Sequence, residues 1–349
     1  MNDDAPLRFA VLGAGFWARV QLAAWGEVPG AVCDAVCDPD RGRAEELARQ
    51  RSVPAVYDDP AALLANEKLD FVDIITPVET HAPLVELAAR HGLPAICQKP
   101  MATSLAEAEK MVETCRAANV PFFVHENWRW QTPIRELAKV LEGGALGHPF
   151  RARIQFSSSF PVFDNQPFLA TLEQFLLTDI GSHVLDVARF LFGEADALFC
   201  QTHRAHKKIQ GEDVATVMLT MRRPNADAST TVVCEMSYAS RLENERFPET
   251  FVLVECEHGS VELGPGCRLA VTTDAGTRVS RVPPPRLTWA DPAYDLVQSS
   301  MVPCCANLLA AIRARDPNLA ETNGEDNLKT VRLIFAAYES ARAGTAVRP

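Results

Sequence analysis

The first third of the chain alternates short apolar runs with stretches of helical periodicity. The apolar runs cover residues 9–12, 31–36, 71–75, 94–97 and 121–124. Apolar positions recur every three to four residues over 43–51, 83–91 and 105–118. Ser104 and Glu107 form a capping-box pair at the start of the last of these helices. Buried strands that alternate with helices form βαβ units, so this region predicts a parallel, doubly wound sheet.

The pattern changes after about residue 125. Helices are predicted over 133–142 and 169–192, with a strand over 150–158 between them. Strand-type segments then follow one another closely, at 214–221, 230–238, 251–256 and 268–273. Two helices, 302–315 and 326–342, close the chain. Strands without intervening helices predict an open, mainly antiparallel sheet in an α+β domain.

Length and composition agree with two globular domains. The 349 residues suit two domains, which we expect at 1–125 and 126–349, with the C-terminal helix able to pack back on the first. Apolar residues make up 47% and charged residues 23%, as in globular proteins. The net charge of −11 disfavours nucleic acid as a partner. No apolar run approaches the ~18 residues that span a bilayer, and the N-terminus has no leader pattern. We therefore expect a cytoplasmic protein without a membrane segment.

The ten cysteines are scattered, and several lie in strand-like runs. Buried thiols of this kind behave as small apolar side chains in a reducing compartment. A zinc site at Cys33 and Cys37 is the alternative, but no second ligand pair has matching spacing. We therefore expect no metal.

A glycine-rich turn follows the first strand directly. Gly13 and Gly15, with Phe16 and Trp17 after them and Ala18 as the small third residue, give G-x-G-x-x-A at the start of a helix. The first glycine allows a tight turn, and the second allows close approach to a pyrophosphate at the helix N-terminus. This context predicts a dinucleotide-binding domain of the Rossmann type, whereas an isolated glycine turn would be weak evidence.

Asp38 supports the same assignment and bears on the cofactor. It follows Ala18 by the ~20 residues expected of the acid that binds the adenine ribose. Its carboxylate would repel a 2′-phosphate, so we expect NAD. Arg41 and Arg43 lie just beyond it. They could contact a 2′-phosphate or could simply begin a surface helix.

Further motifs follow in a distinctive order. These are Thr76-Pro77-Val78-Glu79-Thr80-His81, Gln98-Lys99-Pro100 and Asp179-Ile180-Gly181-Ser182-His183. With the glycine turn, they resemble the glucose–fructose oxidoreductase/inositol dehydrogenase (Gfo/Idh/MocA) family over nearly the whole chain. The resemblance implies a Rossmann domain and a second domain whose open sheet carries the substrate site at one edge. It also implies a homo-oligomer contact on the face of that sheet.

Several stretches, among them 14–19, 96–101 and 125–131, are similar to family members that oxidise a branched aldose to its lactone. Two departures stand out. Gln98 replaces the usual glutamate, which removes an anion beside Lys99 but keeps a hydrogen-bonding group for the nicotinamide ribose. The run 175–178 replaces a glycine-rich segment, which alters the expected substrate pocket.

Oxidation of an alcohol needs a hydride acceptor and a proton acceptor. Lys99 follows an apolar strand, so it leaves the sheet at the carboxyl end, where open α/β sheets bind ligands. Its ammonium can polarise the substrate oxygen, and a cis bond to Pro100 would aim it inward. Asp179 and His183, four residues apart, are expected on one helix face. We expect Lys99, Asp179 and His183 to be catalytic and to meet across the cleft between the domains.

Other polar and aromatic residues follow the same strands. Thr76, Pro77 and His81 are expected to border the cofactor, although His81 could equally cap the next helix. Glu126, Asn127, Trp128 and Arg129 follow the last strand of the first domain and can bind a sugar ring and its hydroxyls. The alternative for half of this cluster is domain-interface core. Asn165 and Gln166 are further substrate candidates from a loop.

The sequence thus predicts an NAD-dependent dehydrogenase that acts on an aldose. Alternatives within the family are an inositol-type polyol dehydrogenase and a dinucleotide-sensing regulator, although a regulator would not need a proton acceptor. A metal-dependent sugar hydrolase or isomerase would need three convergent ligands, which the sequence does not supply.

Overall fold

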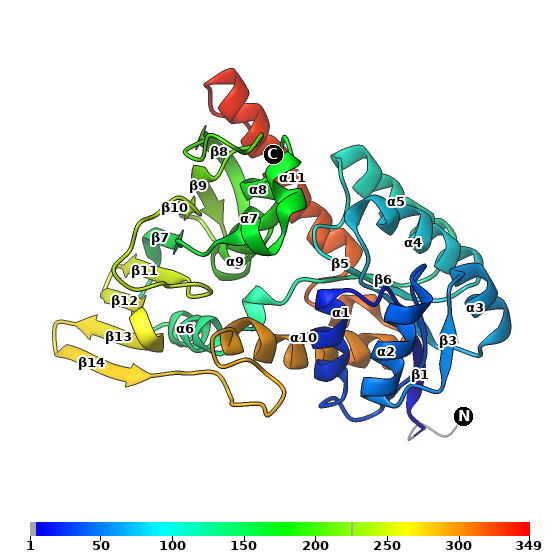
Figure 1. Cartoon of the computed structure of the whole chain (residues 1–349). Coiled ribbons are helices and arrows are strands. Elements are labelled where there is room, and N and C mark those ends of the chain that lie inside the picture. Colours follow the sequence, from blue (N-terminus) through cyan, green and yellow to red (C-terminus); the bar gives the residue numbers. More distant parts are fainter. Residues whose placement is uncertain (1–4, 225) are drawn as a thin grey trace. The chain divides into compact units, whose positions relative to one another are not determined.

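The computed structural model describes residues 5–224 and 226–349 (Figure 1). Contacts divide the chain into two compact units. Unit 1 comprises Met1–Asn127, Leu287–Asp291 and Gln298–Val331, and unit 2 comprises Trp128–Arg286, Pro292–Val297 and Arg332–Pro349. The predicted division at residue 125 stays a proposal, and the contacts associate residues 298–331 with the first unit.

Unit 1 is built on a six-stranded parallel sheet in the order β3-β2-β1-β4-β5-β6. Its strands are β1 (Leu7–Leu12), β2 (Ala31–Cys37), β3 (Ala55–Tyr57), β4 (Phe71–Ile74), β5 (Ala95–Gln98) and β6 (Phe122–His125). Its helices are α1 (Phe16–Trp25), α2 (Arg41–Arg51), α3 (Pro60–Asn66), α4 (His81–Arg90), α5 (Leu105–Ala117), most of α10 (Asp295–Ala314) and the start of α11 (Gly324–Ala343). The strand order reverses between β1 and β4, which is where ligands bind in such sheets. The predicted doubly wound sheet is confirmed.

The core of unit 1 explains why the apolar pattern identified its strands. Phe9 of β1 stacks on Phe71 of β4 with ring centroids 4.9 Å apart, and Trp25 of α1 covers both rings. Ser104 caps α5 as expected, accepting a hydrogen bond from the Glu107 amide at 3.2 Å. The Glu107 carboxylate in turn accepts a hydrogen bond from the amide of Thr103, one residue before the cap. Strand β3 was not predicted, because its three residues are too few to form a recognisable apolar run.

Unit 2 is built on an eight-stranded sheet in the order β14-β13-β12-β11-β7-β10-β9-β8. Its strands are β7 (Pro149–Ser157), β8 (Glu194–His203), β9 (Val214–Arg222), β10 (Thr230–Ser237), β11 (Phe251–Cys256), β12 (Gly259–Gly264), β13 (Arg268–Thr273) and β14 (Gly276–Arg281). β7 and β10 pair in parallel, and the other neighbours pair antiparallel. The predicted mainly antiparallel sheet is confirmed.

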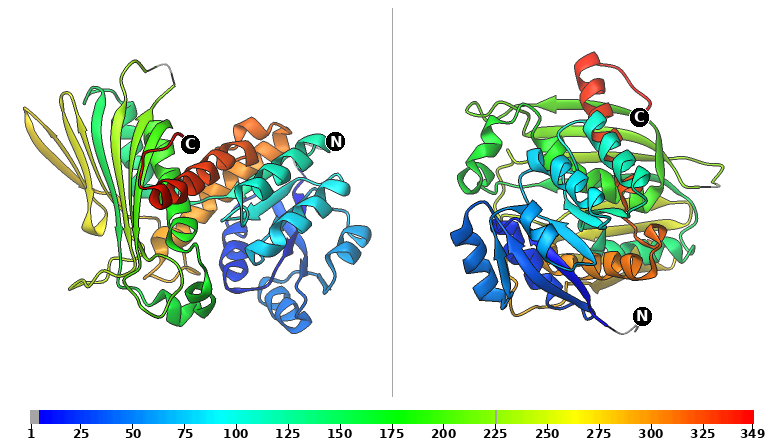
Figure 2. Two further views of the ribbon diagram at one scale, coloured as in Figure 1. Left: turned by 90° about the horizontal axis from the view of Figure 1, so that it is seen from above. Right: turned by 90° about the vertical axis from the view of Figure 1, so that its right-hand side faces the viewer.

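One face of this sheet packs on helices, as Figure 2 shows (left). The unit contains α6 (Thr132–Glu142), α7 (Val162–Asn165), α8 (Leu176–Asp179), α9 (Gly181–Phe192) and the end of α11. Side chains alternate in burial along β7, β9 and β10. On the outer face, Arg153 pairs with Glu235 and Arg151 with Glu255, beside the partly exposed Met218. The outer face therefore mixes ion pairs with apolar side chains.

The single helix expected over 169–192 is wrong. The segment forms a 3-10 turn (Pro167–Thr171), α8 and α9, with a non-helical stretch before α8. The cause is tertiary: the carboxylate of Glu212 accepts from the amides of Phe175 (3.3 Å) and Leu177 (2.9 Å). Ile180 alone separates α8 from α9, and its backbone is right-handed helical (φ −84°, ψ −32°). Asp179 and His183 therefore keep nearly the helical spacing.

Among the described residues, α10 is the one helix long and apolar enough to cross a membrane, and 67% of its most apolar window is buried. Such burial is typical of a core helix. The ten cysteines are free thiols, nine of them buried. Burial raises the pKa of the Cys33 thiol to about 12. No group of three His, Cys, Asp or Glu side chains in the described part of the chain could hold a metal.

Candidate cofactor and catalytic site

The glycine turn has the geometry of a phosphate-binding turn. Gly13 has φ +104°, and a Cβ there would lie 2.2 Å from the carbonyl oxygen of Ile75, so only glycine fits. At Gly15 a Cβ would meet nothing within 4 Å. No side chain caps the first turn of α1. Open space in front of uncapped helix N–H groups fits a cofactor pyrophosphate. Phe16, beside this space, is 67% exposed and packs edge-on against Trp17.

Asp38 stands directly beyond β2 and is buried. One carboxylate oxygen accepts from the Ala14 amide at 2.8 Å, and the other accepts from the Asp40 amide at 2.9 Å. A carboxylate has about four acceptor sites, so capacity remains for two ribose hydroxyls. Arg43 donates to Asp40 at 3.0 Å, and Arg41 donates to Glu45 at 2.9 Å. Both arginines therefore already have carboxylate partners, which agrees with NAD rather than NADP.

Lys99 lies half-buried just after β5, and its peptide bond to Pro100 is cis. The loop that carries it is tied to the loop after β4 by His81. The His81 ring nitrogens lie 3.0 Å from the Thr76 carbonyl oxygen and 3.1 Å from that of Pro100. The imidazole is 1% exposed, and burial lowers its pKa. His81 thus supports the two loops; it does not cap α4, which has no side-chain cap. Pro77, on the loop after β4, is exposed.

Residues at the end of β6 face α10 within unit 1. Asn127 donates to the Ser300 hydroxyl at 2.8 Å. Glu126 is fully buried, and its carbonyl oxygen accepts from the Cys304 thiol at 3.7 Å. These two predicted substrate residues are thus built into the packing of β6 against α10.

In unit 2, His183 and Asp179 each have an aromatic neighbour. The Trp128 ring stacks on the His183 imidazole with centroids 4.4 Å apart and planes 4° from parallel. His183 is 5% exposed. The Tyr238 hydroxyl, just beyond β10, lies 3.4 Å from an Asp179 carboxylate oxygen as donor. Sequence reasoning did not single out Tyr238, because a tyrosine after a strand carries no distinguishing signal.

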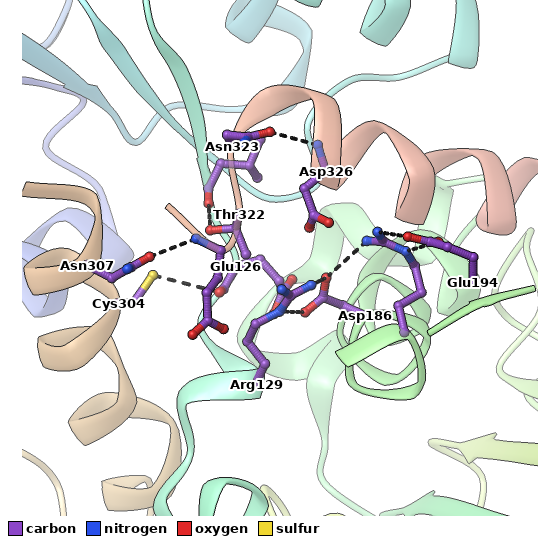
Figure 3. Close-up of polar contacts among 12 residues, drawn as sticks. Glu126, Arg129, Asp186, Glu194, Cys304, Asn307, Thr322, Asn323 and Asp326 are labelled. Carbon is purple, nitrogen blue, oxygen red and sulfur yellow. Dashed lines mark hydrogen bonds and ion pairs between the residues drawn. The ribbon is translucent and has the colours of Figure 1, made fainter. Parts of the chain in front are cut away.

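Arg129 belongs to a buried ionic network. Its guanidinium donates to both carboxylate oxygens of Asp186, from Nε at 2.7 Å and from Nη2 at 2.6 Å. Arg189 lies 3.9 Å from the same carboxylate and pairs with Glu194 at 2.9 Å. Figure 3 shows the Arg129 guanidinium against Asp186. Trp128 and Arg129, adjacent in sequence, therefore contact two residues of α9, His183 and Asp186.

The remaining substrate candidates lie near α7. Gln166 is half-buried directly after this helix. Asn165 ends the helix, and its side chain lies outside the described residues. Another buried acid was missed by sequence reasoning: Glu212 holds the first turn of α8 and also accepts from the Tyr338 hydroxyl at 2.7 Å.

A cavity of about 1130 Å³ lies elsewhere in unit 1. It is lined at the amino ends of the strands by residues such as Leu7, Asp70, Pro94 and Phe122. The glycine turn and Lys99 stand at the opposite, carboxyl ends. The cavity therefore shares no residue with the candidate site.

Unit 1 thus has the fold and the glycine turn of an NAD-binding domain, and unit 2 carries an acid and an imidazole on nearly continuous helices. Comparison with known proteins identifies the class. Residues 7–126 match the model of the oxidoreductase family with an NAD-binding Rossmann fold, and residues 134–262 match the GFO/IDH/MocA C-terminal domain. The chain belongs to the Gfo/Idh/MocA oxidoreductase family, and NAD is its cofactor.

Individual relatives narrow the comparison. The chain is 44% identical to a D-apiose dehydrogenase of Rhizobium rhizogenes, covering 98% of this chain and 97% of the relative. It is 43% identical to a D-apiose dehydrogenase of Paraburkholderia graminis, covering 97% and 88%. A crystal structure of an oxidoreductase from Agrobacterium radiobacter, in complex with NAD+, L-tartaric acid and magnesium, is 43% identical. It superimposes with a TM-score of 0.94 over 99% of this chain and 98% of that one. The predicted family is confirmed, and two of these relatives are D-apiose dehydrogenases.

Proposed function

We propose that this protein is an NAD-dependent dehydrogenase that oxidises an aldose, D-apiose, at its anomeric carbon to the lactone. The observation that carries the proposal is the identity of 43–44%, over nearly the full length, to two D-apiose dehydrogenases. The uncapped glycine turn and the carboxylate of Asp38 support binding of the nucleotide. NAD, when bound, accepts the hydride that leaves the anomeric carbon.

The chain's own residues would handle the proton. We assign the unprotonated nitrogen of His183 as the acceptor of the anomeric hydroxyl proton, and the ammonium of Lys99 as the group that polarises the hydroxyl oxygen. Stacking on Trp128 fixes the plane of the His183 ring. Asp179, with Tyr238 as donor to its carboxylate, would hold a neighbouring substrate hydroxyl. Of the other candidates, we assign Gln166 to a substrate contact, Glu126 and Asn127 to the packing of β6 against α10, and Arg129 to the support of α9.

Two alternatives act on different ligands. One is an inositol-type polyol dehydrogenase, favoured by a match of 27% identity over 188 residues to a myo-inositol 2-dehydrogenase of Thermotoga maritima. The other is a dinucleotide-sensing regulator, which would bind NAD without turnover.

The test is a substrate panel followed at the absorbance of reduced cofactor. D-Apiose, D-xylose and myo-inositol are each offered with NAD, and the product is identified by trapping the lactone with hydroxylamine. We expect the highest kcat/KM with D-apiose and a trapped lactone. Turnover of myo-inositol alone, with a ketone product, would favour the polyol dehydrogenase. NAD binding without turnover of any sugar would favour the regulator.

We also propose that the protein is a cytoplasmic homo-oligomer that associates through the outer face of the eight-stranded sheet. Within the described residues, this face carries Met218 and Leu253 (48% and 37% exposed) among the ion pairs of Arg151 and Arg153. Light scattering after gel filtration should give a multiple of the 38.2 kDa chain mass. A monomer at micromolar concentration would contradict the proposal.

A further inference from the structure

A buried carboxylate lies beneath the loop that carries Lys99. Asp73, in the centre of β4, is 0% exposed. It accepts hydrogen bonds from two neutral groups on α1. These are the side-chain amide of Gln21, at 2.9 and 2.7 Å, and the indole N–H of Trp25, at 2.7 Å. A buried carboxylate needs such donors, so Asp73 determines which end of the Gln21 amide faces it.

The orientation of Gln21 determines that of Gln98. An ionised carboxylate only accepts hydrogen bonds, so the NH₂ end of Gln21 must face Asp73 and its oxygen must face away. That oxygen accepts from the NH₂ group of Gln98. The oxygen of Gln98 then accepts from the backbone N–H of Lys99 at 3.0 Å. All the donors therefore point the same way, from the backbone N–H of Lys99 through Gln98 and Gln21 to Asp73.

We propose that Asp73 and Gln21 are positioning residues that fix the orientation of Gln98 and, through it, the backbone of Lys99. The proposal deepens the proposed function and rests on it, since it assumes that Lys99 takes part in the reaction. It also explains why a glutamine suits position 98 here. A carboxylate there would face the oxygen of Gln21 and could not accept from it. Gln21 would then have to turn its oxygen toward Asp73.

The surroundings of Asp73 make the arrangement sensitive to pH. Burial raises the pKa of Asp73 to about 7, against the opposing effect of the Trp25 and Gln21 hydrogen bonds. The titratable groups near it are the thiols of Cys33 on β2, Cys97 on β5 and Cys305 on α10. Burial raises the pKa of each thiol, so these groups stay neutral.

His125, on β6, faces the far end of the hydrogen-bonded chain, with Nδ1 3.5 Å from the Gln98 amide nitrogen and Nε2 3.5 Å from Cys305. Once protonated, Asp73 can donate to the oxygen of Gln21, so the side-chain amides of Gln21 and Gln98 can both reverse their orientation. The rate should therefore have an acid limb that Asp73→Asn removes. Because the His125 imidazole lies beside Gln98, the His125→Gln variant serves as a check on which group causes that limb.

Substitutions that reverse the polarity test the proposal. In Asp73→Asn, the new NH₂ group can donate to the oxygen of Gln21, so both amides turn and the NH₂ group of Gln98 meets the N–H of Lys99. We expect kcat to fall by ~10-fold while the Kd for NAD stays within ~2-fold. Gln98→Glu should cost a similar factor in kcat. The double variant restores complementary polarity along the whole chain, so its kcat should return to within ~3-fold of the original. Such non-additivity is expected of groups in one network.

Trp25→Phe is the matched control, because it removes a donor to Asp73 but leaves the three amide contacts in place. Because the lost hydrogen bond held the pKa of Asp73 down, its acid limb should move to higher pH, whereas kcat on the alkaline plateau should stay within ~2-fold of the original. Losses that simply multiply in the double variant, or an unchanged kcat in Asp73→Asn, would overturn the inference.

The same comparison of Asp73→Asn, Gln98→Glu and the double variant can be made on Tm, which needs no substrate. If the unaltered protein oxidises no sugar, the proposed function fails, and the Tm cycle still tests the hydrogen-bonded chain. Recovery of Tm in the double variant would support the chain, and additive losses of Tm would overturn it.

Discussion

Two buried carboxylates, Asp73 in unit 1 and Asp186 in unit 2, are both 0% exposed yet are stabilised in opposite ways. Asp73 has neutral donors from Gln21 and Trp25. Asp186 has the guanidinium of Arg129 at hydrogen-bonding distance. An arginine stays charged at all physiological pH values, so the second carboxylate belongs to a fixed ionic framework. A carboxylate among neutral donors can gain a proton near neutrality, so the first can change the polarity of its neighbours.

The difference matches what each carboxylate supports. Asp186 lies three residues after His183 on α9, and its partner Arg129 follows Trp128, whose ring stacks on His183. The ionic network therefore fixes the position of an aromatic ring and an imidazole. Asp73 supports only the orientation of two amides, which costs little to reverse.

The largest expected effect comes from breaking the ionic network. Arg129→Met keeps much of the side-chain volume but removes both hydrogen bonds to Asp186 and leaves Arg189, 3.9 Å away, as a cation beside it, so unfolding free energy should fall by ~3 kcal/mol. Urea denaturation measures the loss. The double variant Arg129→Met/Asp186→Leu removes the charge as well and should recover most of the stability. Equal losses in the single and double variants would mean that the pair does not act as a unit.

The next effect is on the chemical step. His183→Asn keeps size and some hydrogen bonding but removes the titratable nitrogen, so kcat should fall by ~10²-fold or more. Steady-state kinetics with the best aldose measures it, and NAD affinity should be nearly unchanged. Trp128→Phe, which keeps a ring against residue 183, is the control and should cost far less. Lys99→Met should also cost mainly kcat. If His183→Asn kept near-full turnover, the proton acceptor would lie elsewhere.

The third prediction separates the two carboxylates by pH. The folded-state pKa of Asp73 is raised from 3.8 to about 7, so the folded protein binds this proton more tightly than the unfolded chain does. Its contribution to stability is therefore fully present below about pH 4 and is lost as pH rises toward 7. The free energy of unfolding of the unaltered protein, relative to Asp73→Asn, should drop as pH rises from about 4 to about 7. The drop should be on the order of 1 kcal/mol or more, since that is what one pKa unit is worth. If the stability difference between the unaltered protein and Asp73→Asn did not depend on pH, Asp73 would be a permanently ionised carboxylate like Asp186.

The sequence predicted the elements whose cause is local. The six-stranded sheet and the glycine turn follow from apolar runs and from a φ that only Gly13 tolerates. The break in the helix over 169–192 could not be predicted, because the carboxylate that causes it, Glu212, lies 35 residues after Leu177. The catalytic candidates Lys99 and His183 were named from motifs. Their supports were not, because Gln21, Tyr238 and Asp186 acquire meaning only from partners distant in sequence.

The smallest expected effect concerns the choice of cofactor, and it tests a third carboxylate whose surroundings lie between those of Asp73 and Asp186. Asp38 is buried, accepts from the amides of Ala14 and Asp40, and has Arg43 at 3.9 Å. Its charge should favour NAD, because a 2′-phosphate would face a carboxylate. We expect a higher kcat/KM with NAD than with NADP. Asp38→Ser keeps a hydrogen-bonding group for the ribose and removes the charge. It should therefore lower the ratio of kcat/KM with NAD to kcat/KM with NADP by ~10-fold. Without the Asp38 charge, Arg43 could reach the 2′-phosphate of NADP. The double variant Asp38→Ser/Arg43→Ala should therefore recover part of the preference for NAD. Equal use of both cofactors by the unaltered protein would show that the Asp38 charge does not select between them.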